Sequence, residues 1–256
     1  MTDSISDQRI KAILVLLATA ATIAFNVLAA TGYVNGVTPA EISGKYPTVI
    51  TPAGYAFSIW SLIYVGLSAF SVYQLLPGNL ERFGSIRTLY IASCVLNCAW
   101  IYFWHHDQIG FCLILIFALA VLLILIAAKF RNAVTPAETF IVKGTFGLYA
   151  GWVSVASLVN LAVFFRSNDS PMASSNLVAV VIVIIATAAA ILAARFAANH
   201  FYPFAVAWAL TAIAVKQSAN TAIVVACAIG VIVSLLMAIS FVLKLPSSPL
   251  NLRENE

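Results

Sequence analysis

The chain has 256 residues, of which 62% are hydrophobic and only 9% are charged. An ordinary soluble domain is about half apolar and about a quarter charged, so this chain cannot cover a soluble surface with polar groups. The net charge of +4 comes from basic residues scattered singly along the chain, and such scattering argues against a nucleic-acid-binding patch. The composition therefore predicts an integral membrane protein without a large soluble domain.

Long apolar runs predict an all-α fold, a polytopic transmembrane helix bundle of about eight spans. A helix needs about 20 apolar residues to cross a hydrocarbon core of about 30 Å. The run 113–128 is continuously apolar and lacks the alternation of a membrane β-barrel strand. The expected spans are 10–30, 53–76, 86–104, 109–128, 139–165, 176–197, 201–215 and 220–243. The seventh is short, and a re-entrant or interfacial segment is the alternative there.

Basic residues predict the orientation, because cytoplasmic loops carry an excess of Lys and Arg. Ten of the 13 basic residues fall at the two termini and at the second, fourth and sixth connections. We therefore expect a multi-pass protein of the cytoplasmic (inner) membrane with both termini in the cytoplasm. The longest connection on the opposite side, 31–52, contains Pro39, Gly44, Pro47 and Pro52, and a loop of that length and polarity is a candidate lid.

Aromatic and amide residues recur at helical spacing inside the second and third predicted spans. Trp60 and Tyr64 are one turn apart and share a face. Asn97, Trp100 and Trp104 follow one stripe of the third span. Such residues lie away from the helix ends, where an interfacial aromatic belt would place them.

The fifth predicted span repeats this spacing with Tyr149, Trp152, Ala156 and Asn160. An amide in hydrocarbon costs several kcal/mol unless it finds partners, so Asn97 and Asn160 should face protein, water or a ligand. One interpretation is a cavity between helices that orients a flat ligand with its amides. The other is ordinary interhelical packing in which Asn acts as polar glue. These residues by themselves favour packing over a cavity.

Three segments resemble a known family in order and spacing. Segment 51–64 (TPAGYAFSIWSLIY) is similar to the second helix of the TspO/translocator protein family, also called tryptophan-rich sensory proteins. Segment 96–100 (LNCAW) is similar to its third helix, and 149–152 (YAGW) with Ala156 and Asn160 to its fifth. Pro52-Ala53 and Ser58 stand where the family has a double proline and a further proline before the Trp.

The resemblance implies a five-helix membrane unit at 1–165, and it leaves 166–256 as a three-helix C-terminal membrane extension. It also implies a pocket under the first long loop that binds tetrapyrroles such as porphyrins or haem, and sterol-like molecules in some members. No cofactor is expected to be required, and a tetrapyrrole is the expected ligand. The candidate ligand-binding residues are Tyr55, Trp60, Tyr64, Asn97, Trp100, Tyr149, Trp152 and Asn160.

Metal binding and catalysis are not expected. Cys94 and Cys98 are one turn apart, but His105 lies two turns beyond Cys98, too far for one closed set of ligands. Lys216 could suggest a Schiff-base lysine, yet no span interior supplies a carboxylate counter-ion, so it is interpreted as a snorkelling side chain. The absence of carboxylates within the spans also argues against a proton-coupled pump.

Small residues predict close helix approach within the chain or in a homodimer, without deciding between them. They form two sets, Gly147 with Gly151, and 222, 226, 230, 234 and 238 in the last span.

The leading hypothesis is a non-enzymatic sensor or carrier for a planar hydrophobic molecule. A passive or exchange-type transporter is the first alternative, for which Pro203 and the short seventh span are the sequence features. A scaffold subunit of a membrane complex is the second.

Overall fold

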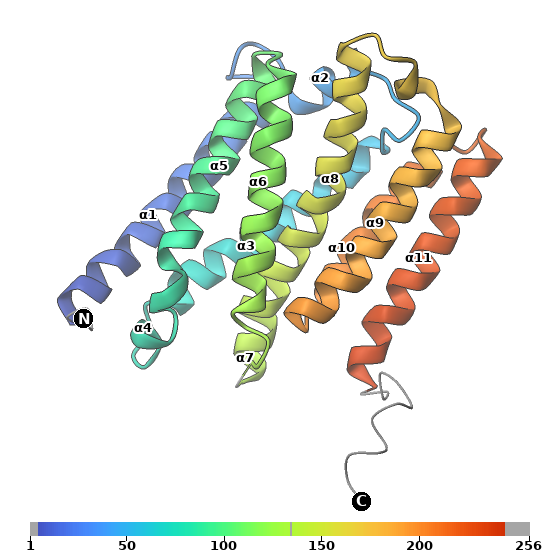
Figure 1. The fold of residues 1–256 in the computed structure, drawn as a ribbon. Coiled ribbons are helices and arrows are strands. Elements are labelled where there is room, and N and C mark those ends of the chain that lie inside the picture. Colours follow the sequence, from blue (N-terminus) through green and yellow to red (C-terminus); the bar gives the residue numbers. More distant parts are fainter. Residues whose placement is uncertain (1–4, 134, 244–256) are drawn as a thin grey trace, which may run out of the picture.

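The structure is a computed structural model, and it describes residues 5–133 and 135–243. Those residues form helices joined by turns, without a strand, and the predicted all-α bundle is confirmed (Figure 1). The elements in chain order are α1 (Ile5–Ala30), α2 (Pro39–Lys45), η1 (Gly54–Ser58), α3 (Ile59–Tyr73), α4 (Asn79–Arg82), η2 (Gly84–Ile86), α5 (Arg87–His105), α6 (Ile109–Ala128), α7 (Pro136–Glu138), η3 (Thr139–Gly144), α8 (Thr145–Ser167), η4 (Pro171–Ser174), α9 (Asn176–Ala197), α10 (Phe201–Lys216) and α11 (Thr221–Val242).

Within the described residues, seven helical stretches are long and apolar enough to cross a membrane. Helix α10 is also apolar but shorter, with 16 residues. The predicted spans 109–128 and 176–197 coincide with α6 and α9. Pro203 lies in the first turn of α10, where a backbone N–H has no acceptor within the helix. It therefore leaves α10 unbroken, and this sequence feature does not give a discontinuous helix.

Polar residues begin several of the helices and explain where they start. Ser175 Oγ accepts from the Val178 N–H at the start of α9, and Asn220 Oδ1 accepts from the Ile223 N–H at the start of α11. Each such acceptor satisfies one of the N–H groups that the first turn of a helix leaves without a partner. The apolar runs between these caps then continue as uninterrupted helix.

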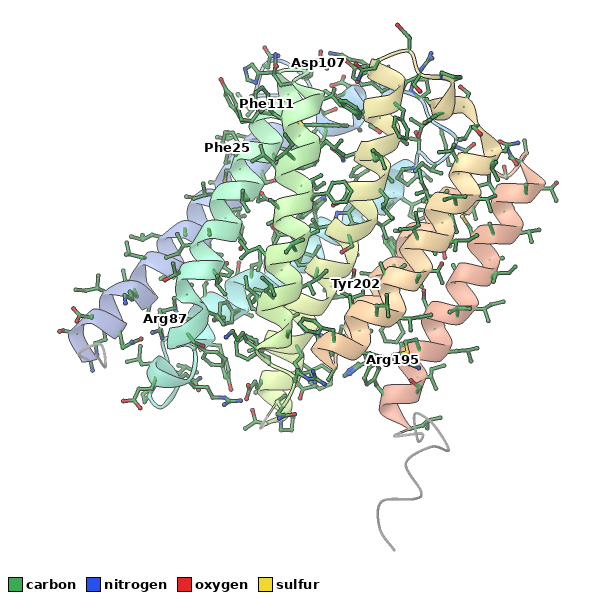
Figure 2. The ribbon with its side chains drawn as sticks, in the orientation of Figure 1. Phe25, Arg87, Asp107, Phe111, Arg195 and Tyr202 are labelled. Atoms are coloured by element: carbon green, nitrogen blue, oxygen red, sulfur yellow. The ribbon has the colours of Figure 1, made fainter. Side chains whose placement is uncertain are left out.

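The two ends of the bundle differ in what they carry. The start of α1 and the end of α11 lie at one end, the terminal face, and residues 31–58 lie across the other, the loop face (Figure 1). An even number of crossings gives this arrangement. Figure 2 shows Arg87 and Arg195 toward the terminal face and Asp107 at the loop face. Lys244 and Arg253, which the charge argument also uses, lie outside the described residues.

Helix α8 occupies the centre of the bundle. It packs against α3, α6, α9 and α10, and the whole stretch 149–153 is buried. A helix that is buried on every side needs an apolar surface all round, and this explains why α8 shows no clear amphipathic pattern. The residues of α8 can therefore reach several neighbouring helices at once.

A π-helical segment, η3, separates α7 from α8. The wider π turn loosens the normal backbone ladder, and the carbonyl oxygen of Lys143 accepts a hydrogen bond from Asn199 Nδ2 at 2.8 Å. Asn199 is fully buried in the turn between α9 and α10. The irregular start of α8 is thus anchored to the C-terminal helices.

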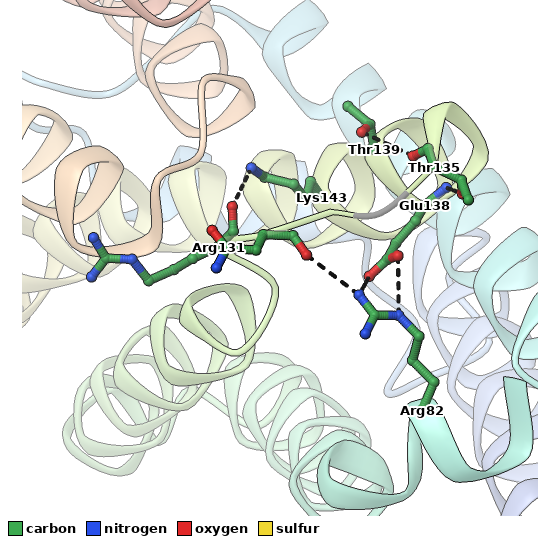
Figure 3. Close-up of polar contacts among 7 residues, drawn as sticks. Arg82, Arg131, Thr135, Glu138, Thr139 and Lys143 are labelled. Atoms are coloured by element: carbon green, nitrogen blue, oxygen red, sulfur yellow. Dashed lines mark hydrogen bonds and ion pairs between the residues drawn. The ribbon is translucent and has the colours of Figure 1, made fainter.

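Ionic and polar contacts close the terminal face. Arg82 Nε donates to Glu138 Oε2 at 3.1 Å, and its Nη2 pairs with the other oxygen of the same carboxylate (Figure 3). Glu138 is buried while Arg82 is partly exposed. This bidentate pair joins α4 to α7, and such planar pairing is geometrically specific.

A buried arginine joins three further elements at the same face. Arg87 has no exposed surface, and its Nε donates to Gln74 Oε1 at 2.8 Å while Nη2 donates to the Leu80 carbonyl at 2.7 Å. Its Nη1 donates to Gln8 of α1. Gln74 in turn donates to the carbonyl of Ala12 at 2.9 Å. A buried charge needs such full hydrogen bonding, so this network fixes α1, α3 and α5 together.

The glycines of α8 contact helix α10 and the turn before it, in the same chain. A Cβ added to Gly151 would lie 2.4 Å from the Tyr202 carbonyl oxygen and 2.9 Å from the Ala205 Cβ, and one added to Gly147 would lie 2.3 Å from Asn199 Oδ1. Gly230 of α11 likewise lies against Thr187 and Leu210. Close approach at these three glycines therefore occurs within one chain.

The proposed boundary at 165/166 falls in the last turn of α8. Helix α10, from the C-terminal part, packs directly against α8 and η1. The division into 1–165 and 166–256 stays a prediction.

Gly151→Ala should destabilise the fold by about 1–3 kcal/mol, because the added methyl meets backbone that cannot move without separating α8 from α10. Thermal unfolding of the detergent-purified protein, followed by circular dichroism, measures the change. Gly110→Ala is the matched control, since its Cβ would meet only Phe164 at 3.9 Å. Equal melting temperatures for the two variants would contradict the close packing described for Gly151.

Candidate functional site

A small cavity lies beneath α2 and among α3, α5, α8 and α10. We call it the inner cavity, and its volume is about 50 Å³. It is lined by Pro39, Ser43, Pro52, Phe57, Trp60, Trp100, Trp104, Trp152, Val155, Ala156, Val159, Asn160, Val163, Ala209 and Ile213. Four of the five tryptophans of the chain are therefore in its wall.

A larger hollow adjoins it on the side of α1. This outer groove has a volume of about 470 Å³ and lies between α1, α3 and α5, again beneath α2. It is lined by Asn26, Val27, Ala30, Thr38, Pro39, Ala40, Gly54, Phe57, Trp60, Ser61, Tyr64, Trp100 and Ile101. Pro39, Phe57, Trp60 and Trp100 line both spaces, so they form the partition between them.

Trp60 is the central ring of this partition. Its indole stacks on Tyr64 with ring centroids 5.5 Å apart, and it meets Tyr149 and Trp152 edge to face at 5.7 and 6.4 Å. Edge-to-face and offset contacts are the favoured geometries of aromatic pairs. Trp60 and Tyr64 therefore lie on one face of α3, as their spacing in the sequence predicts.

A chain of buried amides and a phenol holds the helices that carry these rings. Asn26 Nδ2 of α1 donates to Asn97 Oδ1 of α5 at 2.7 Å, and Asn97 Nδ2 donates to the Tyr149 hydroxyl of α8 at 3.0 Å. Asn97 has no exposed surface. Its amide therefore meets protein partners, as the cost of burying an amide requires.

The second predicted amide contacts an indole. Trp100 Nε1 donates to Asn160 Oδ1 at 3.2 Å, and Asn160 Nδ2 donates to the Ala156 carbonyl at 2.9 Å. Trp104 stacks on Trp100 with centroids 5.8 Å apart. These contacts fix the wall of the inner cavity that α5 and α8 form.

Trp152 carries an unsatisfied donor. Its side chain is 3% exposed, and among the described residues no acceptor lies within hydrogen-bonding distance of Nε1. A buried donor without a partner is unfavourable by about 1–3 kcal/mol. An acceptor brought to this donor would remove that cost.

Helix α2 and its flanking turns cover both spaces. Pro39 lines each of them, and its carbonyl accepts from Trp104 Nε1 at 3.3 Å. Lys45 Nζ pairs with Asp107 at 2.8 Å and so ties α2 to the turn after α5. The hydrogen bond to Asp107 raises the pKa of Lys45 above its usual value of 10.5, so the cationic partner of this pair persists throughout the neutral range. The loop 31–52, predicted as a candidate lid, lies over the site.

The eight predicted residues have three kinds of position. Trp60, Trp100, Trp152 and Asn160 line the inner cavity, and Tyr64 lines the outer groove. Asn97 and Tyr149 lie behind the walls, where they bond to each other. Tyr55 is 44% exposed and meets Trp208 of α10 edge to face, at 5.4 Å, away from both sets of lining residues.

Sequence reasoning missed several residues of the site. Phe57 lies inside the segment 51–64, three residues before Trp60 and seven before Tyr64, and this helical spacing could have found it. Asn26 could have been found as an amide inside the first predicted span. Ala209 and Ile213 come from α10, and no motif marked that helix.

The cysteines and histidines are spread apart. Among the residues that the structure describes, no group of three or more His, Cys, Asp or Glu side chains could hold a metal ion. His105 is buried, with Nδ1 against the Ile101 carbonyl at 2.7 Å, whereas His106 is exposed.

The family model described as TSPO-like protein matches residues 12–241. The chain belongs to the TSPO-like protein family. Comparisons with curated proteins and with solved structures gave no match. The matched range runs from the second turn of α1 almost to the end of α11. It therefore includes the helices after α8, which the sequence segments above did not relate to the family.

Membership of the TSPO-like family indicates a multi-pass membrane protein of the ligand-binding or transport type, in a family that is generally non-enzymatic. The protein is accordingly surrounded by the lipid bilayer. Within this TSPO-like chain, the inner cavity and the outer groove are the spaces that could hold a small molecule in the centre of the bundle.

Asn97→Ala should destabilise the protein by about 1–3 kcal/mol, because it leaves the Tyr149 hydroxyl without its donor. In a double-mutant cycle with Asn26→Ala, we expect a coupling energy of about 1 kcal/mol, within the range known for hydrogen bonds between membrane helices. The free energy of unfolding in detergent is measured for the unchanged protein, the two single variants and the double variant. A cycle of Asn97→Ala with Asn168→Ala, an exposed amide at the end of α8, should give no coupling. Equal coupling in the two cycles would contradict the Asn26–Asn97 bond.

Proposed function

We propose that this protein binds a planar hydrophobic molecule, a tetrapyrrole, in a pocket made by the inner cavity and the outer groove. The observation that carries this proposal is the convergence of Trp60, Trp100 and Trp152 beneath one cover. Flat indole rings offer a large apolar surface to a flat ligand. The family supports ligand binding in general terms.

The size of the two spaces bears on how binding would occur. Ligand pockets usually enclose about 300–1,000 Å³, so the outer groove of about 470 Å³ is within that range and the inner cavity of about 50 Å³ is not. A tetrapyrrole would occupy the outer groove and displace part of the partition toward the inner cavity. Rotation of Trp60, which lines both spaces, would join them.

The chemistry of the walls fits a molecule with a wide apolar face and an acceptor at its edge. The lining side chains are aromatic and aliphatic, apart from a few polar groups such as Asn160 and Ser43. The unsatisfied indole N–H of Trp152 would donate to a ligand carboxylate or carbonyl oxygen. Tetrapyrroles with acidic side chains combine both properties.

The role that we assign is that of a sensor or carrier in the cytoplasmic membrane, with the terminal face toward the cytoplasm. The basic residues Arg82, Arg87 and Arg195 lie in the segments that turn at that face, in agreement with the positive-inside rule.

A homodimer through small residues would use Ala222 and Ala226, since Gly147, Gly151 and Gly230 pack within the chain.

Titration of the detergent-purified protein with protoporphyrin IX, followed by the shift of its Soret absorption, tests the proposal. Trp60→Ala and Trp152→Ala should each weaken binding by at least about tenfold, because each removes an indole of the pocket wall. Trp152→Phe keeps the ring and loses the donor, so it should weaken binding by about fivefold. Phe196→Ala, an exposed aromatic of α9, is the control and should bind as the unchanged protein does.

Non-saturable absorption changes that are equal in all four variants would mean that the porphyrin partitions into detergent, and they would reject the proposal. Uptake of the porphyrin into sealed vesicles that contain the protein separates a carrier within the membrane from a transporter. A scaffold subunit would bind no ligand and would be purified with partner proteins.

A further inference from the structure

Helix α10 contributes directly to the wall of the inner cavity. Ala209 and Ile213, one turn apart on this helix, line the cavity together with Trp152 of α8. Both α10 side chains are buried, at 2% exposure each. The helix lies close to α8 in the two turns before Ala209, because Gly151 leaves room for the Tyr202 carbonyl and the Ala205 methyl.

Helix α10 is also bonded to the segment that covers the pocket. The Ala53 N–H donates to the Ala212 carbonyl at 2.9 Å, and Trp208 Nε1 donates to the Ala56 carbonyl at 3.0 Å. Gln217 Nε2 donates to the Thr48 carbonyl at 3.3 Å. Two of these bonds come from α10 and the third from Gln217, the residue after it, and together they connect this end of α10 to residues 48–56. The position of α10 relative to the cover is therefore fixed.

The aromatic and amide side chains that line the inner cavity differ from the aliphatic ones, which come from α8 and α10, in how they are held. Trp60, Trp100 and Asn160 take part in ring contacts or hydrogen bonds with neighbouring helices. Ala209 and Ile213 are aliphatic and have no polar atoms in their side chains. A change of size at these two positions alters the space available without removing a bond from the network.

We infer that α10 forms the wall that sets the size of ligand the pocket admits, with Ala209 and Ile213 as its specificity-determining residues. This inference rests on the proposed function, since it concerns the same pocket. A cavity of about 50 Å³ must widen to receive part of a planar ligand. The small Ala209 leaves space on the α10 side, and Ile213 restricts it.

Two pairs of substitutions test the inference, with the Soret titration by protoporphyrin IX on the full-length protein as the measurement. Ala209→Phe fills the space and should weaken binding by at least about tenfold. Ile213→Ala removes the restriction and should tighten binding by about fivefold. Their matched controls are Thr211→Phe and Val215→Ala on the exposed face of α10, which should change the affinity by less than about twofold.

The opposite signs make the test independent of folding, because a variant that only damaged the structure would weaken binding at both positions. If Ala209→Phe and Ile213→Ala follow their controls, or weaken binding together, while Trp152→Ala still reduces the affinity, the inference is wrong and the proposed function stands. If the unchanged protein shows no saturable binding, the proposed function is itself wrong, and the inference is rejected with it.

Discussion

The amide of Asn97 is buried where three helices meet, and water cannot reach it there. In hydrocarbon an amide must find its partners within the protein, and Asn97 does so by accepting from Asn26 and donating to Tyr149. These two bonds set the positions of α1, α5 and α8 relative to one another. The rings that build the pocket are mounted on this frame, since Trp100 lies one turn from Asn97 and Trp152 one turn from Tyr149. A frame held by directional bonds keeps the indoles in place even though the packing between membrane helices is mostly non-directional.

The pocket that results is divided by its own side chains. Trp60 stands between a small inner cavity and a larger outer groove, and the cover over both is tied down at two ends. Lys45 holds it to the turn after α5, and the backbone of Ala53 holds it to α10. Trp60 therefore controls how far a ligand in the outer groove can reach into the inner cavity. The C-terminal helices thus take part in the same site as the first five, which agrees with a family match that covers both parts.

Much of the fold could be predicted from the sequence, because in a membrane the length of an apolar run nearly determines a span. Two of the predicted spans agree with α6 and α9 to the residue. The irregular elements could not be predicted in this way, since the π turn at η3 is bonded to Asn199, which is far away in sequence. The predicted ligand-binding residues stay a prediction, and where each of them lies relative to the inner cavity and the outer groove depends on the direction of its side chain. Tyr55 lies in the 3-10 segment η1 and meets Trp208 of α10, a contact that the periodicity of the second span does not indicate.

A structure determined with protoporphyrin IX bound would show whether one pocket is formed by α1, α3, α5, α8 and α10 together. We expect the ring system in the outer groove, with Trp60 rotated, an acceptor of the ligand at Trp152 Nε1, and one edge of the ring against Ala209. Density for the ring on the lipid-facing surface, for example in the apolar groove between α9 and α11, with Trp60 and Trp152 as they are now, would contradict it.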